Sequence, residues 1–571
     1  MKTRTILSTT GLLLAIPLAS FFLAGRRTHI PSLPVIEEVR SQYGLYLSSI
    51  IANSNNDFFY LVGNYNDAVR GKGGNDFLGR LYIISDLGGK REEALEAAWV
   101  AKAAENAAAS IYITSREMID GNISEALKVI GSVEPGIVRD IFQAWVLLAG
   151  NQKNVATDSL ARHISPRNRS SVVPALIALG GIYSQIGDIS NAEIIYNTAS
   201  SHKLGITDLE HMAAFYDLSG NGKGLDFLKS YSERFPLSSL GDLIYWIENR
   251  KYKPVLIDTP DRGFATALLK ITDSILDTND ESLYDSAFLY ANQALLLWPE
   301  LHAARISRAR IFLALGRDDD FLAELARIPN GSFLQNTSRL MLADYYSDSG
   351  DIRQARLLYN AVISDNPGAL QAYMSLGRML FSNNNNRDAI RIFSKGAARS
   401  DNRFLRSRFF YFRGIAHEHN GDFESALADL SNAVELDPSE PSILNSYGYF
   451  LVDRKIDIEK GMRYIEKALR TDRENANFID SYGWALFRQG NLEDAALVLQ
   501  YARLLNPTSA VISDHLATVY WAQGRKNEAK FEWSKALNNL RDEDRFENLT
   551  REILKYRLNN GFDGSVIARG K

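Results

Sequence analysis

Residues 480–507 read DSYGWALFRQGNLEDAALVLQYARLLNP, and this stretch decides the fold. Apolar residues recur at spacings of three and four on both sides of Gly490, which is typical of two amphipathic helices joined by a turn. The small residues Gly483 and Ala495 allow the two helices to approach closely. Pro507 closes the unit, because proline cannot continue a preceding helix. The stretch therefore predicts an antiparallel pair of helices.

The same pattern recurs along the chain from about residue 302 to 541. The small residue of the first helix returns every 34 to 37 residues, at Ala309, Ala343, Gly377, Gly414, Gly448, Gly483 and Ala517. A second small residue follows twelve positions after most of these sites, at Ala355, Ala389, Ala426, Ala495 and Ala529, with Gly461 displaced by one. A fixed period of this length indicates stacked copies of one supersecondary unit.

This pattern resembles the tetratricopeptide repeat, a 34-residue unit of two helices with small, aromatic and proline residues at these offsets. The resemblance is strong over 302–541, survives mainly in the second helix over 264–300, and is weaker but recognisable towards the amino terminus. It implies an all-α fold, a superhelical solenoid of stacked antiparallel helix pairs.

The expected layout follows from where the pattern is strong and where it breaks. Residues IENRKYKPVLIDTPDRG interrupt the register. Near the carboxyl terminus, Phe546, Leu549, Ile553 and Leu554 share one face of a helix, as a terminal capping helix requires. We expect degenerate repeats over 35–236, a joint between two solenoid halves over 237–263, repeats over 264–541, a capping helix over 542–558 and a disordered tail over 559–571.

The amino terminus has the layout of an export signal. Lys2 and Arg4 precede an uncharged run over residues 5–25. The run also has about the ~20 residues needed to cross a hydrocarbon core. Residues 1–34 are therefore expected to be a cleaved signal peptide or a membrane anchor, and both remain open. A third alternative is a buried amino-terminal helix of a cytoplasmic protein.

Composition excludes several classes of function. Of the 571 residues, 64 are basic and 68 acidic, which gives a formal net charge of −4. This lacks the basic footprint of a dedicated nucleic-acid binder, so we expect no nucleic-acid partner. The chain has no cysteine, so it has no disulfide, thiolate zinc site, cysteine nucleophile or lipidated cysteine.

No pattern in the sequence indicates an active site. His417 and His419 are two residues apart and point to different sides of a helix, unlike the four-residue spacing of a zinc-binding pair. The glycine-rich GKGGND at 71–76 does not match a phosphate-binding loop. His515 is the most interesting remaining histidine, but sequence alone places no partner beside it. We expect no catalytic residue, no metal and no cofactor.

The resemblance implies a binding groove instead. In tetratricopeptide proteins the second, fifth, ninth and twelfth residues of each unit generally face the concave side of the solenoid. Counting from the small residue at position eight predicts a groove formed by Tyr411, Ile415, Asn445, Tyr449, Asp480, Trp484, Phe487, Asp514 and Trp521. Such a stripe could bind an extended or helical peptide. In this interpretation Trp484 is not a core residue; the alternative is that the rings pack between adjacent first helices.

The carboxyl-terminal repeats narrow the resemblance. LNSYGYFLVDRKIDIEKGMRYIEKAL, DSYGWALFRQGNLEDA and DHLATVYWAQGRKNEAKFEWSKAL resemble the last repeats of exported tetratricopeptide proteins of Gram-negative bacteria. This implies a non-catalytic scaffold or adaptor in the periplasm, secreted or anchored in the inner membrane, with proteins or peptides of the cell envelope as partners. One alternative is an adaptor that presents substrates such as murein hydrolases to a carboxyl-terminal processing protease. Another is a cytoplasmic regulator or assembly chaperone.

Overall fold

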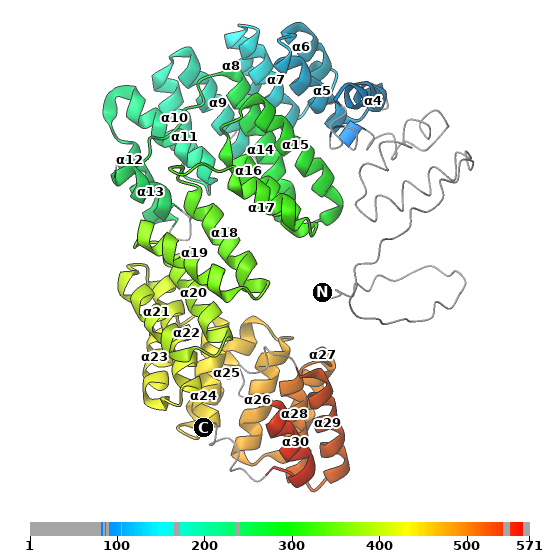
Figure 1. Ribbon diagram of the computed structural model, residues 1–571, viewed down its shortest axis with the longest axis vertical. Coiled ribbons are helices and arrows are strands. Elements are labelled where there is room, and N and C mark those ends of the chain that lie inside the picture. Colours follow the sequence, from blue (N-terminus) through cyan, green and yellow to red (C-terminus); the bar gives the residue numbers. More distant parts are fainter. Residues whose placement is uncertain are drawn as a thin grey trace, which may run out of the picture. The chain divides into compact units, whose positions relative to one another are not determined.

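The structure is a computed structural model, and its regular elements are helices throughout the part of the chain that it describes (Figure 1). That part comprises residues 82, 83, 86, 91–103, 105–164, 172–235, 240–249, 251–540 and 549–562. The chain divides into two compact units, 1–74 and 75–571, and all described residues belong to the second. The predicted signal peptide or anchor at 1–34 lies outside the described residues.

Helices that follow one another in sequence pack as pairs, and each pair contacts the next (Figure 1). The earlier helices are α4 (Arg91–Ala103), α5 (Ala107–Ile119), α6 (Ile123–Gly131), α7 (Ile137–Ala149), α8 (Lys153–Ala161), α9 (Val173–Ile186), α10 (Ile189–Ala199), α11 (Ile206–Tyr216), α12 (Gly224–Arg234) and α13 (Gly241–Glu248). The later helices are α14 (Pro260–Thr278), α15 (Tyr284–Leu297), α16 (His302–Ala314), α17 (Asp318–Ala326), α18 (Gln335–Asp348), α19 (Ile352–Asp365), α20 (Leu370–Ser382), α21 (Asn386–Arg399), α22 (Arg403–His419), α23 (Phe423–Leu436), α24 (Pro441–Asp453), α25 (Ile458–Thr471), α26 (Ala476–Gln489), α27 (Leu492–Leu505), α28 (Ala510–Ala522), α29 (Lys526–Asn539) and α30 (Arg551–Asn560).

The helix pair predicted from residues 480–507 is confirmed as α26 and α27. Gly490 ends α26 with a φ of +88°, a left-handed conformation that favours glycine. Asn491 then caps α27 by accepting the backbone N–H of Asp494. Ala495 is fully buried between the two helices. The all-α solenoid predicted from the repeat is therefore confirmed.

The small residues of the repeat mark the points where paired helices touch. A Cβ added at Gly448 of α24 would lie 2.6 Å from the backbone oxygen of Gly461 in α25, and the reverse contact has the same distance. Neither position has room for a side chain. The displaced small residue at 461 is thus the partner of Gly448 in one backbone-to-backbone contact.

The segment 237–263, predicted to be a joint, is a packed part of the fold over its described residues. It contains α13, whose Leu243 and Trp246 share a hydrophobic core with Phe333. Asp242 in α13 accepts a hydrogen bond from the side-chain amide of Asn366 at 2.6 Å. The segment therefore packs against parts of the chain that follow it, at Phe333 and Asn366.

Helices α14 and α15 pack against the earlier pairs as well as against α16. The ring of Phe264 lies 4.7 Å from that of Phe142 in α7, and Ser115 in α5 donates to Gln293 in α15 at 3.2 Å. Gly263 lies so close to Trp145 that a Cβ there would meet the indole at 2.4 Å. Since α14 contacts α5, α7 and α9, the chain itself covers these first helices.

The carboxyl terminus differs from its prediction. Leu549 and Leu554 are buried, as expected for a cap, and the helix observed is α30, Arg551–Asn560; residues 541–548, including Phe546, lie outside the described residues. The predicted tail began at 559, but α30 continues to 560 and Phe562 packs against the array, so this boundary is wrong. Residues 563–571 lie outside the described part.

Among the described helices, none is both long and apolar enough to cross a membrane.

Candidate functional site

The predicted groove positions lie on the first helices α22, α24, α26 and α28, and their burial divides them into two groups. Asp480, Trp484 and Asp514 are buried. The others are half-buried and keep part of their surface open to solvent, namely Tyr411, Ile415, Asn445, Tyr449, Phe487 and Trp521.

Trp484 is a core residue, so the prediction that it is not one is wrong. Its side chain is only 2% exposed. The indole stacks on the His515 ring with centroids 4.3 Å apart and planes 20° apart, and its N–H donates to Oδ1 of Asp453 at 3.0 Å. The ring lies between the first helices α26 and α28, which is the packing that the alternative interpretation described.

The carboxylate of Asp480 also binds a side chain within the protein. Its Oδ2 lies 2.8 Å from Nδ1 of His515, and the other ring nitrogen of His515 lies 3.5 Å from the Tyr449 hydroxyl. Three successive first helices thus meet at this histidine. Asp480 and His515 lie one repeat apart in the sequence. This spacing is the only feature of the sequence that could have suggested a contact between them.

Asp514 has two internal partners. Its Oδ1 accepts the indole N–H of Trp533 at 2.9 Å, and its Oδ2 pairs with the guanidinium of Arg557 in α30. Arg557 is itself buried. Removing either partner of this buried pair would leave an uncompensated charge, and the pairing leaves no lone charge for a ligand.

Four of the half-buried predicted groove positions are Tyr411, Asn445, Tyr449 and Phe487, and we call these four residues the open groove. The Tyr411 hydroxyl lies 3.3 Å from Oγ of Ser446, which joins α22 to α24. Asn445 carries a side-chain oxygen that is buried from solvent and has no hydrogen-bond partner among the described residues. An unsatisfied buried acceptor is costly, so this oxygen would gain a hydrogen bond from a ligand that displaces the side chains covering it.

Sequence reasoning missed Glu418 in this region. It occupies the twelfth position of its repeat, so the rule that identified Tyr411 and Ile415 could have found it. Burial raises the pKa of its carboxyl, and Arg454, which directly follows α24 and lies at 3.1 Å, opposes part of this increase. The pair joins α22 to α24 beside the open groove.

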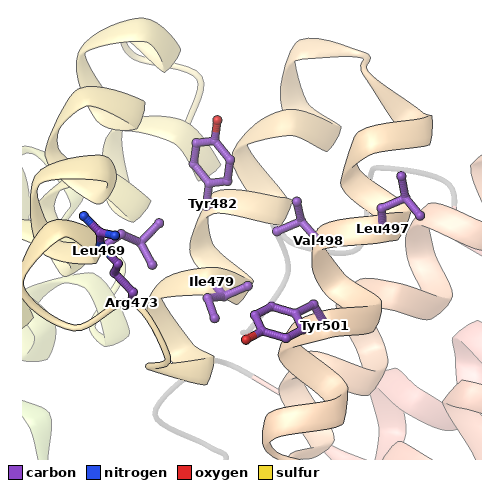
Figure 2. Close-up of a pocket in the computed structure, with 7 residues that line it drawn as sticks. All are labelled: Leu469, Arg473, Ile479, Tyr482, Leu497, Val498 and Tyr501. Atoms are coloured by element: carbon purple, nitrogen blue, oxygen red, sulfur yellow. The ribbon is translucent and has the colours of Figure 1, made fainter.

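A depression in the surface is lined by residues from α25, α26 and α27 and the turn after α25 (Figure 2). It has a volume of about 430 Å³, and its lining is mostly apolar: Leu469, Arg473, Ile479, Tyr482, Leu497, Val498 and Tyr501. Leu497 and Tyr501 are exposed in it, and the repeat pattern did not predict it.

The two histidines at the end of α22 have different surroundings. His417 approaches Asp422 through Nδ1 at 3.1 Å, whereas His419 packs edge-on against Phe381 with ring centroids 5.1 Å apart. The two rings thus have different neighbours. Within the described ranges, no cluster of three or more acidic, histidine or cysteine side chains could hold a metal ion.

Comparison with known proteins gives one family and several similar chains. A family model described as tetratricopeptide repeat matches residues 340–404 and 382–441. A TPR repeat-containing protein of Pseudomonas aeruginosa is 26% identical over 183 residues, which cover 32% of this chain and 30% of that protein, so the chain matches under a third of its relative's length.

Two solved structures are similar to parts of the chain. A tetratricopeptide repeat protein from Parabacteroides merdae is 12% identical with a TM-score of 0.34, covering 52% of this chain and 97% of that one. YrrB, described as a TPR protein with an unusual peptide-binding site, is 15% identical with a TM-score of 0.25, covering 33% of this chain and 96% of its own.

Proposed function

Because this chain is a solenoid of tetratricopeptide repeats, we propose that it is a non-catalytic protein-binding scaffold or adaptor that holds an extended polypeptide in its open groove. The observation that carries the proposal is the unpartnered side-chain oxygen of Asn445, which lies one helical turn before the half-buried Tyr449 on α24. A backbone N–H of a bound peptide would satisfy this oxygen once the side chains that cover it move aside.

The side chains around Asn445 suit such a ligand. Tyr411 and Tyr449 are half-buried, and the exposed part of each ring can cover an apolar side chain of a peptide. Phe487 extends the apolar surface by one repeat. Aromatic rings supply binding area and the amide fixes the register, a division of roles common in peptide recognition.

The first prediction is that Asn445→Ala weakens peptide binding without weakening the fold. Peptides are selected from a random library displayed on phage against the full chain, and the Kd of the best one is measured by fluorescence anisotropy. Loss of a buried hydrogen bond should cost about 1–3 kcal/mol of binding free energy, or roughly five- to 150-fold in Kd. Thermal stability should be unchanged, because the substitution removes an acceptor that has no partner.

Asn432→Ala is the matched control. Asn432 is an exposed asparagine on α23, the second helix of its pair, and lies outside the predicted groove positions. This variant should bind the selected peptide within twofold of the wild-type chain. Equal affinity of wild type and Asn445→Ala would place the binding site elsewhere, and the apolar depression on α25–α27 would be the next surface to test.

The proposed place of action is the periplasm of a bacterium. The support is in the sequence: Lys2 and Arg4 followed by the uncharged run at 5–25. A fusion of alkaline phosphatase to residues 1–40 should be active in cells, because this enzyme needs export to fold. The same fusion carrying Leu13→Arg, which breaks the apolar run, should lose most of the activity. An inactive parent fusion, or equal activity of both, would contradict export.

A further inference from the structure

Helix α30 is fixed to the last repeat by two buried side chains. Leu554 is fully buried, and Arg557, 6% exposed, pairs with Asp514 of α28. Asp514 is one of the predicted groove positions. Helix α30 therefore contacts α28 at a predicted groove position. The residues that follow α30 then reach Phe487 of α26.

The two residues that follow α30 continue along the predicted groove, and we call residues 561–562 the C-terminal hook. Gly561 has a φ of +83°, and a Cβ there would lie 2.0 Å from Cζ2 of Trp521, so only glycine fits. The ring of Phe562 then packs edge-on against Phe487 with centroids 6.2 Å apart. The guanidinium of Arg557 lies over the Phe562 ring, 5.2 Å from the ring centroid.

We propose that the C-terminal hook is an internal ligand, which occupies the carboxyl-terminal end of the groove and competes there with a bound polypeptide. This inference rests on the proposed function, because Phe487 belongs to both the open groove and the hook contact. Phe562 occupies the position that an aromatic or large apolar side chain of a partner would take. The chain thus holds part of its own binding surface covered.

The contacts allow the hook to leave while α30 stays. The anchors of α30 are the fully buried Leu554 and the Arg557–Asp514 pair, and Phe562 contacts this pair through the guanidinium of Arg557. The hook itself is not helical, and its ring is only half-buried. When the site is open in only a fraction of the molecules, the apparent affinity for a partner is the intrinsic affinity multiplied by that fraction. Release of the hook should therefore strengthen binding.

The test uses the full chain and a thiol introduced by Phe487→Cys, which labels cleanly because the chain has no cysteine. Adding Gly561→Ala should dislodge the hook, since a Cβ has no room beside Trp521. We expect the rate of maleimide labelling to rise about tenfold. Phe562→Ala, which removes the ring without backbone strain, should raise it similarly and serves if Gly561→Ala folds poorly.

Gly524→Ala is the matched control for backbone strain. Gly524 also has a positive φ, +80°, but a Cβ there would meet no atom within 4 Å. It should leave the labelling rate of the Phe487→Cys chain within twofold. If neither Gly561→Ala nor Phe562→Ala raises labelling above this control, the hook does not cover Phe487 and the inference is overturned.

Competition is measured with the phage-selected peptide on chains that keep Phe487. Gly561→Ala and Phe562→Ala should each bind it at least threefold more tightly than wild type, and Gly524→Ala should not. Faster labelling with unchanged peptide affinity would overturn competition and leave the groove function intact. If Asn445→Ala shows that no peptide uses the groove, the proposed function fails, and the labelling rates still decide whether the hook covers the ring.

Discussion

Replacing Trp484 with alanine is expected to destabilise the carboxyl-terminal repeats by about 3–5 kcal/mol, the usual range for removing a buried tryptophan. The ring is 2% exposed and packs with Val452 and Ile465 besides stacking on His515. Its loss would also leave Asp453, a buried residue, without the indole N–H. Urea unfolding followed by circular dichroism should show a lower midpoint for the carboxyl-terminal transition.

Two further variants separate the contributions at this site. Trp484→Phe keeps an aromatic ring but removes the donor to Asp453, so it should cost less than Trp484→Ala. Leu504→Ala on α27 removes an apolar side chain that is 74% exposed and should change stability by less than about 0.5 kcal/mol. A Trp484→Ala chain as stable as Leu504→Ala would show that the ring is not part of the core.

The contacts within a repeat could be predicted from the sequence because they depend on residues close together in the chain. Gly483 and Ala495 belong to one hairpin, and the spacing between them determines which side chains meet. Their size alone indicates how closely the helices approach.

Contacts between repeats could not be predicted in this way. Whether Trp484 is covered depends on how closely α28 approaches α26, and therefore on His515, one repeat later. The sequence gives the repeat length but not the superhelical geometry that brings His515 onto the indole and next to Asp480. The contact of α14 with α7, through Phe142 and Phe264, spans many repeats and leaves no periodic signal.

The C-terminal hook could not be predicted from the sequence for a different reason. NNGFDG has the composition of a turn or a tail, so disorder was the natural prediction from residue 559 onward. Gly561 is required there because of Trp521, a residue forty positions earlier in the chain. A requirement for glycine that arises from a distant ring cannot be distinguished, within one sequence, from a flexible tail.

Glu210 in α11 should make the stability of the fold depend on pH. Burial raises the pKa of this carboxyl to about 7, although hydrogen bonds from the Tyr252 hydroxyl and from the Val255 backbone N–H lower it. In the unfolded chain its pKa is near 4.5. Below 4.5 the carboxyl is protonated in both states, and the stability that it contributes is fully present. As pH rises through 7 that stability is lost, because the folded chain must then hold a buried charge.

Glu210→Gln should remove this loss. The difference between about 7 and 4.5 corresponds to about 3 kcal/mol as an upper estimate. The variant should therefore be more stable than wild type by about 1–3 kcal/mol in urea unfolding at pH 8, and equally stable at pH 4. His211, whose pKa burial lowers to about 3, has the opposite pH dependence, which is the same in both chains and cancels in the comparison.

Tyr252→Phe tests the cause of the shift at the same site. It removes the hydroxyl that stabilises the ionised carboxyl, so the pKa of Glu210 should rise further and the loss of stability should extend to higher pH. The variant keeps the ring that packs against Phe333. A constant stability difference between Glu210→Gln and wild type from pH 4 to 8 would mean that Glu210 has an ordinary pKa. In that case water would reach the carboxyl, and residues 252–257 would not seal α11 from solvent.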